Sequence, residues 1–254
     1  MNSHRDTEAQ RTSGQEAIRF PSESPSLCGP NDFLLWQLAD SAFPTGGFAH
    51  SAGLEAAWQH GEVRNRTELL TFLETNLQQL GRAALPFVNT AYDEPGRLAQ
   101  LDQLSDAFLS NHVANRASRL QGRAFLTAVE RIFPAARAAP PLVPDGAGGP
   151  ADRAPFAHLA PTFGACLREL DVPRPTVIRL FFFSHLRSLL AASVRLNIVG
   201  PMEAQVLQHR LATLTETVAV RASVFTLTDL AQTAPLLDLW QGAQDRLYSR
   251  LFQT

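Results

Sequence analysis

The chain has 254 residues, of which 45% are apolar and 18% charged, and its formal net charge is −2. All 22 basic residues are arginine, because the sequence contains no lysine. This excludes P-loop and kinase-type phosphoryl transfer and Schiff-base chemistry, since each of them needs a lysine side chain. General nucleic-acid binding is disfavoured, because it depends on surplus positive charge that displaces counterions from phosphate.

Cysteine usage and the first residues bear on the cellular compartment. The two cysteines, Cys28 and Cys166, lie far apart and form neither a CxxC pair nor a secreted disulfide framework. Residues 1–30 mix acidic and basic side chains without an apolar core, so we expect a disordered tail and no secretory signal. These patterns favour a reducing, cytoplasmic location.

Apolar residues recur at intervals of three and four, and no stretch alternates as a strand would, so the chain is predicted to be all-α. In the first half, the pattern predicts a helix that begins at Asp32 and stops before Pro44, followed by a helix through Leu54 and Trp58 to Gly61. A third helix is expected from a capping box of Asn65 and Glu68 to Gly81. Further helices are expected at roughly 84–92, 98–110 and 112–132.

Residues 134–155 contain six prolines and three glycines and are predicted to form a flexible surface insert. The insert could divide two domains. We favour a single helical bundle over residues 31–254, because neither half shows boundaries of its own. In the second half, helices are expected from Pro161 to about Leu170, from Thr176 to Leu196, from Pro201 onward, and in final segments that carry Leu236, Leu239, Trp240, Leu247 and Phe252.

The segment from Thr176 to Leu196 is apolar on most sides, which makes a membrane span the competing interpretation. Arg179, His185, Arg187 and Arg195 interrupt it, whereas a span needs about 20 predominantly apolar residues. We therefore predict that it is the central buried helix of the bundle and that the protein has no membrane partner.

The sequence Ala49-His50-Ser51-Ala52-Gly53 approximates the nucleophile elbow of serine hydrolases. An elbow requires a preceding strand, and the residues before Ser51 form a turn sequence. The later histidines available to a triad are His158, His185 and His209. A hydrolase using Ser51 is the alternative function, but we favour Ser51 as the N-cap of the helix that follows.

Seven histidines raise the question of a metal site. None of them has the i, i+4 spacing that places two imidazoles on one helix face, and no HExxH or clustered Cys/His set occurs. The sequence therefore predicts no metal site within one chain and no tightly bound cofactor. A site shared between two copies across a symmetric interface stays open.

Two groups of arginines are candidates for protein contacts. Arg116, Arg119 and Arg123 recur at helical spacing and form a row that is either a solvated helix flank or a partner surface. We expect the row to be free for a partner, because Glu130 is the only acidic residue in that helix. Ser184, Arg187, Ser188 and Arg195 form a polar seam on the long apolar helix, which is satisfied either within the bundle or at an interface. An RNA-binding role for the arginine row is least favoured by the net charge.

Five segments in order resemble one protein family. The stretch LLWQLADSAFPTGGFAHSAGLEAAWQHGEV, from Leu34 to Val63, closely resembles the opening motif of the UreF family of urease accessory proteins. SNHVANRASRLQGRAFL (110–126), HLAPTFG (158–164), LRSLLAASVRLNIVGPMEAQVLQ (186–208) and the ending LYSRLFQT follow in the family's order. The resemblance covers about residues 32–254 without the insert.

The resemblance implies an all-α homodimer that is not an enzyme. Family members bind the scaffold accessory protein UreD, also called UreH, and the GTPase UreG, and the assembled complex delivers nickel to apo-urease. The implied role is that of an adaptor, with nickel handled by the complex. His50 stands where bacterial members commonly have tyrosine, so the first motif is more similar to the eukaryotic branch.

The resemblance also assigns candidate partner-binding residues. The last segment, from Leu247 to Phe252, is expected to become ordered when a partner binds. By resemblance the candidates are Pro44, Gly46, Gly47, Phe48, Ser51 and Glu55 in the first motif, Arg116, Gln121 and Gly122 in the second, Arg187, Ser188 and Arg195 in the long helix, and Tyr248, Arg250, Leu251 and Phe252 near the end. His50 of the first motif and Arg119 and Arg123 of the arginine row complete the set.

Overall fold

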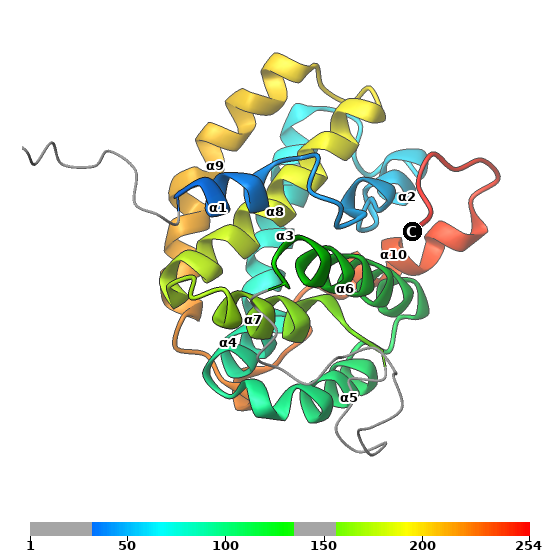
Figure 1. The fold of residues 1–254 in the computed structure, drawn as a ribbon. Helices are drawn as coiled ribbons and strands as arrows, with labels where there is room; N and C mark the ends of the chain where they lie inside the picture. Colours follow the sequence, from blue (N-terminus) through cyan, green and yellow to red (C-terminus); the bar gives the residue numbers. More distant parts are fainter. Residues whose placement is uncertain (1–31, 135–155) are drawn as a thin grey trace, which may run out of the picture.

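The computed structural model describes residues 32–134 and 156–254, and Figure 1 shows these residues as packed helices. No strand occurs among them, so the all-α prediction is confirmed. The tail predicted over 1–30 and nearly all of the insert predicted over 134–155 lie outside the described residues.

The helices follow the predicted order. Before the undescribed segment they are α1 (Asp32–Ala39), α2 (Leu54–Gln59), α3 (Arg66–Ala83), α4 (Leu85–Asp93), α5 (Leu98–Phe108) and α6 (His112–Ile132). After it come α7 (Leu159–Glu169), α8 (Arg174–Arg195), α9 (Pro201–Ala222) and α10 (Pro235–Ala243). Single 3₁₀ turns connect some of them: η1 (Gly47–Ala49), η2 (Pro95–Arg97), η4 (Leu227–Asp229) and η5 (Gln244–Arg246).

Several predicted boundaries were wrong. Helix α3 continues through Gly81 to Ala83, and α7 begins two residues before Pro161. The predicted N-cap of α3 is confirmed, because the Asn65 side chain accepts the N–H groups of Thr67 and Glu68. The return bond of the capping box differs, since the Glu68 carboxylate accepts the N–H of Arg64 at 2.6 Å.

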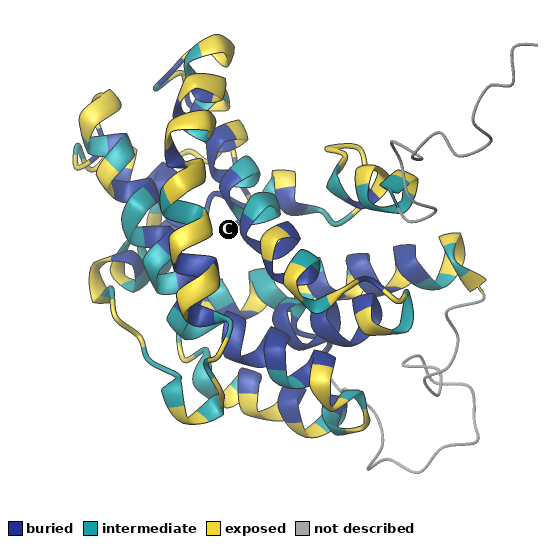
Figure 2. Ribbon diagram, turned by 90° about the vertical axis from the view of Figure 1, so that its left-hand side faces the viewer, coloured by how far each residue is buried: buried dark blue, intermediate teal, exposed yellow. Residues whose placement is uncertain are grey.

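Helices α7 and α8 lie inside the bundle. Helix α7 packs against α4, α6, α5 and α8, and its residues from Ala160 to Leu167 are all buried. Helix α8 packs against α9, α3 and α4 and reaches α1 and α2. Figure 2 shows the buried residues concentrated on the inward sides of the helices. Helix α8 is long and apolar enough to cross a membrane, yet more than half of its apolar stretch is buried within the fold, as predicted for a central helix.

A column of aromatic rings runs through the core. Phe43 packs on Phe125 of α6 with ring centroids 6.0 Å apart, Phe125 stacks on Phe163 of α7 at 5.0 Å, and Phe163 contacts Phe181 of α8 at 5.3 Å. Offset and tilted rings at these separations add to the stabilisation from burial alone. The column joins the turn after α1 to the two central helices.

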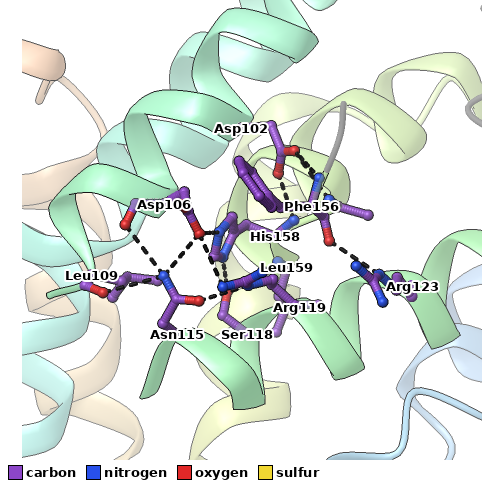
Figure 3. Close-up of polar contacts among 11 residues, drawn as sticks. Asp102, Asp106, Leu109, Asn115, Ser118, Arg119, Arg123, Phe156, His158 and Leu159 are labelled. Carbon is purple, nitrogen blue, oxygen red and sulfur yellow. Dashed lines mark hydrogen bonds and ion pairs between the residues drawn. The ribbon is translucent and has the colours of Figure 1, made fainter. Parts of the chain in front are cut away.

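Directly before α7, three successive backbone N–H groups converge on one carboxyl group (Figure 3). Asp102 of α5, which is fully buried, accepts the N–H of Phe156 at 2.7 Å, of Ala157 at 3.0 Å and of His158 at 2.7 Å. Ala157 has a left-handed backbone with φ 56°, and such a turn directs neighbouring N–H groups toward a common acceptor. Asp102 therefore fixes the chain directly before α7.

Ser118 and His158 complete the start of α7. Ser118 Oγ accepts the N–H of Leu159, the first residue of α7, at 3.2 Å and lies 3.0 Å from His158 Nδ1. The Nε2 atom of the buried His158 lies 3.1 Å from Asp106 Oδ1. The side chain of His158 makes no capping bond to its own helix, so α6 supplies the cap from outside.

We predict that Asp102→Asn lowers the free energy of unfolding by about 2–4 kcal/mol, because the amide turns an N–H₂ donor toward backbone donors and leaves buried N–H groups without an acceptor. Urea unfolding measures the loss. Asp93→Asn is the matched control, since Asp93 forms an exposed ion pair with Arg174 and its loss costs at most about 1 kcal/mol. Equal effects of the two substitutions would contradict the assigned role of Asp102.

Candidate functional site

Three segments that are distant in the sequence meet beside α2: the turn before it, the C-terminal end of α8, and residues 247–254. The turn is shaped by Gly53, which has φ 87° and is the N-cap of α2. A Cβ atom on Gly53 would lie 3.0 Å from the backbone nitrogen of Gln241 in α10. Both the backbone conformation and the close approach therefore require glycine at this position.

Glu55 holds the last residues of the chain against the bundle. Its side chain is 1% exposed and lies in the first turn of α2. It accepts the backbone N–H of Leu251 at 2.6 Å, the backbone N–H of Phe252 at 3.2 Å and the side-chain amide of Gln244 at 2.5 Å. A buried carboxylate needs such donors, because desolvation without them is costly.

Backbone bonds join the end of the chain to the first motif. Ser51 donates its N–H to the carbonyl of Thr254 at 2.7 Å, and Gln253 donates to the carbonyl of Ala49 at 2.9 Å. The Nδ1 atom of His50 is hydrogen-bonded to the hydroxyl of Thr254. His50 and Thr254 are both buried, and burial together with the positive charge of Arg116 lowers the pKa of His50 to about 4.

Arg195 binds both segments from α8. Its guanidinium donates to the carbonyl of Phe48 and, at 3.2 Å, to the carbonyl of Leu251. It also lies 4.2 Å from the ring centroid of Phe252, within the range of a cation–π interaction. Phe48, His50, Glu55 and Arg195 with residues 247–254 are called the tail clamp below.

The tail clamp corrects two expectations about the end of the chain. Residues after Arg246 form no helix, although Leu247 and Phe252 were assigned to one. The segment was also expected to await a partner, and the structure places it on its own bundle, with Phe252 buried. Tyr248, Arg250 and Leu251 stay exposed.

The structure does not support a hydrolase elbow at Ser51. The residue is fully buried, and its hydroxyl has no hydrogen-bond partner among the described residues. A 3₁₀ turn precedes it instead of a strand. The N-cap assignment was also wrong, because Gly53 occupies that position and Ser51 contributes only its carbonyl, which accepts the N–H of Leu54 at 3.1 Å.

The row of arginines on α6 is not free, contrary to the prediction, because other elements supply the acceptors. Arg116 pairs with Asp245 at 2.8 Å. Arg119 pairs with Asp106 at 3.4 Å and lies over the ring of Phe156 at 4.9 Å. Arg123 donates to the carbonyl of Phe156 at 3.3 Å. The acidic partners lie outside α6, since Asp106 is on α5 and Asp245 follows α10.

The polar seam of α8 is satisfied partly within the chain. Arg187 donates to the carbonyl of Ala39 at the end of α1. A Cβ on Gly47 would lie 3.0 Å from Ser188 Oγ and 3.6 Å from Gln121 Oε1, so the turn passes close to both side chains. The seam therefore anchors α1 and the first motif to the central helix.

Gly122 of α6 is required by a close approach to the start of α7. A Cβ at this position would lie 1.9 Å from the carbonyl oxygen of Ala157, well inside van der Waals contact. Pro44 and Gly46 lie on the turn between α1 and η1, where Pro44 is exposed and Gly46 has φ 70°. These three residues shape the backbone near the site without presenting functional groups.

Sequence reasoning missed Asp245 and Gln244, which follow α10. Asp245 accepts from Arg116 and from Arg250, the latter at 3.1 Å, and its carboxylate lies 3.2 Å from His112 Nε2. The hydrogen bond and positive charge of Arg116, with additional help from His112, hold the pKa of Asp245 below its usual value. No spacing rule links Asp245 to α6 more than a hundred residues earlier.

Metal ligands do not gather in the parts of the chain that the structure covers. No group of three His, Cys, Asp or Glu side chains is placed to hold an ion there. His158 is engaged by Ser118 and Asp106, and burial lowers the pKa of His185 to about 4. Burial also raises the pKa of Cys166 to about 12, so its thiol is not poised to ligate.

We predict that Glu55→Gln releases the tail clamp, because one acceptor oxygen becomes a donor that faces backbone N–H groups. Loss of about 2 kcal/mol of local stability corresponds to roughly thirtyfold faster amide hydrogen exchange at residues 251–254. Mass-spectrometric exchange measures it. Glu62→Gln on the exposed turn after α2 is the control and leaves the exchange unchanged.

We predict that acidification weakens the fold through His50. Its pKa is lowered in the folded state, so between pH 6.5 and about 4 the unfolded chain binds more protons and stability falls as the pH falls. From pH 7 to pH 5 the contribution of His50 is about 1–2 kcal/mol. Urea unfolding of the parent chain and of His50→Gln at both pH values isolates the contribution of His50 to stability. Identical pH dependence in the two chains would refute the lowered pKa assigned to His50.

Known proteins resemble this chain over most of its length. The family model for UreF matches residues 63–212. Urease accessory protein F of Arabidopsis thaliana is 40% identical over 221 residues, which cover 85% of this chain and 90% of that protein. Urease accessory protein F of Oryza sativa subsp. indica is 36% identical over 236 residues, 92% of this chain and 89% of that one.

A bacterial relative shows a similar extent of likeness. Urease accessory protein UreF of Mesorhizobium japonicum is 33% identical over 237 residues, which cover 91% of this chain and 99% of that protein. Plant and bacterial relatives thus match the chain nearly from end to end. The extent of these matches, together with the family model, shows that the chain belongs to the UreF family.

Proposed function

We propose that this chain is a urease maturation factor: a non-catalytic adaptor that, with the UreD/UreH scaffold, recruits the UreG GTPase and helps to deliver nickel to apo-urease. The observation that carries the proposal is the near full-length likeness to proteins named urease accessory protein F. The structure adds a physical reason for an adaptor role in the surface that the tail clamp builds.

The tail clamp binds the backbone of Phe48 and Leu251 and leaves their side chains exposed to solvent. The backbone groups of Phe48 and Leu251 are both bound by Arg195, whereas their side chains are 73% and 58% exposed. Tyr248 and Arg250 are exposed nearby in the sequence. Aromatic and arginine side chains on a rigid backbone are the groups that contribute most to protein interfaces, because little conformational freedom is lost on binding.

Two features support the assignment of chemistry to other chains. The sequence contains no lysine for nucleotide hydrolysis, and the buried Ser51 hydroxyl is not positioned as a nucleophile. We propose that nickel is cargo held by the complex and that this chain acts in the cytoplasm as a homodimer.

The proposal predicts a complex whose assembly depends on the tail clamp. Phe48→Asp with Leu251→Asp should weaken binding of the UreD/UreH scaffold at least tenfold, since a charge replaces apolar contacts. Co-expression with UreD/UreH and UreG homologues, followed by size exclusion with light scattering, measures the assembly. Val220→Asp, an exposed apolar residue on α9, is the control.

The decisive outcome is the dependence of assembly on this chain. Accessory proteins that form a complex of the same mass without the chain would refute the adaptor role. An intact complex with the double variant would leave adaptor function in place and remove the tail clamp as its surface.

A further inference from the structure

A cavity of about 240 Å³ lies inside the bundle between α3, α4, α6, α7 and α8. Most of its wall is apolar and includes the rings of Phe87, Phe125, Phe163 and Phe181. Among the described residues that line it, Arg187 is the one side chain that is charged near pH 7, because there is no aspartate or glutamate and burial lowers the pKa of both histidines to about 4. The wall therefore combines a large apolar area with one positive charge.

The guanidinium of Arg187 lies where this wall meets the end of α1. Its Nη1 atom donates to the carbonyl of Ala39, next to Leu38, which also lines the cavity. Its Nε and Nη2 atoms have no hydrogen-bond partner in residues 32–134 and 156–254, and neither is among the enclosed polar atoms that lack a partner, so both keep accessible surface. The same two atoms of Arg179 bind the carboxylate of Glu216, at 2.9 and 2.6 Å. The edge of Arg187 that binds a carboxylate in bidentate geometry is thus open.

The protein compensates the charge of Arg187 only in part. Burial lowers the pKa of its guanidinium, and the negative charge of Asp40, which is exposed to solvent, opposes this effect without cancelling it. No acidic side chain in the described parts of the chain forms an ion pair with Arg187. An anion in the cavity would supply the partner that a partly desolvated cation lacks.

Hydroxyl groups lie beside this guanidinium. Ser184 is followed by Arg187 three positions later and by Ser188 four positions later, so the three side chains share one side of α8, and all of them line the cavity. Thr45 adds another hydroxyl. Its Oγ1 atom and Ser188 Oγ lie 3.5 and 3.0 Å from the point that a Cβ on Gly47 would occupy. O–H donors and a cation therefore occur together in one part of the wall.

Other polar side chains of the wall are engaged within the protein. Ser118 Oγ accepts the N–H of Leu159 and lies 3.0 Å from His158 Nδ1. His50 and Thr254 are hydrogen-bonded to each other. The charge and the open donors of Arg187 therefore determine which head group fits the cavity.

The volume of the cavity sets the size of the ligand. An apolar cavity of about 150 Å³ accommodates benzene, and this cavity is about 1.6 times as large. The additional volume fits a carboxylate that is joined to a ring by a short linker. The phenylalanine rings of the wall favour an aromatic body, because tilted and stacked rings attract one another beyond the gain from burial.

We propose that this cavity binds a small aromatic monocarboxylate, with its carboxylate on the open edge of Arg187 and its ring among the phenylalanines. The probe that matches these requirements is phenylacetate. The proposal goes beyond the adaptor role and does not depend on it, because the described wall belongs to this chain alone.

The test is titration of the full chain with three ligands by isothermal calorimetry. Phenylacetate should bind with a Kd below about 1 mM. 2-Phenylacetamide has nearly the same shape without the charge, and acetate keeps the charge without the ring. Each of these two should bind at least about tenfold more weakly. Absence of phenylacetate binding, or equal affinity for either of the other two ligands, would overturn the proposal.

Two variants locate the ligand. Arg187→Gln should remove the preference for phenylacetate over 2-phenylacetamide, and an unchanged preference would contradict the role of Arg187. Arg210→Gln, the same substitution at an exposed position of α9, is the matched control and should keep the preference. Ala117 lines the cavity, so Ala117→Leu should weaken both aromatic ligands at least about tenfold by reducing the volume. The three ligands on the parent chain decide the proposal even where a variant fails to fold.

Discussion

The buried carboxylate of Glu55 is the interaction on which the candidate site depends. It satisfies two backbone N–H groups of the last residues and one side-chain amide, and without it these donors would lose their acceptor in a place closed to water. The end of the chain then lies against η1 and α8, where Arg195 bonds to both segments. The position of Leu251 on the surface depends on this buried acceptor, and Arg195 binds the backbone of Phe48 together with that of Leu251.

Local patterns in the sequence predicted the helices because they depend on neighbours along the chain. The stripe from Leu69 to Leu80 and the cap at Asn65 identify α3 without any tertiary information. The prediction that α3 ends at Gly81 was wrong, because a glycine inside a helix cannot be distinguished in the sequence from a glycine that ends one. In the structure its missing side chain leaves room for Val218 of α9, a contact no local pattern contains.

The sequence identified residues of the candidate site but did not predict which of them contact one another. Family resemblance singled out Glu55, Arg195 and Phe252, and the structure brings these three together. The arginines of α6 were expected to be free because acidic residues were sought within the helix. Asp245 and Asp106, which neutralise Arg116 and Arg119, come from other elements. Ion pairs between different helices depend on how the helices pack, so they cannot be predicted from the spacing of charged residues along the chain.

The attachment of Phe156, Ala157 and His158 to Asp102 has a consequence for protein engineering. Helices α6 and α7 pack against each other, and Arg123 also bonds to Phe156, so the start of α7 is fixed by groups on α5 and α6. A redesign that repositions α7 must therefore keep the acceptors on α5 and α6, because α7 cannot move without losing the three backbone bonds to Asp102.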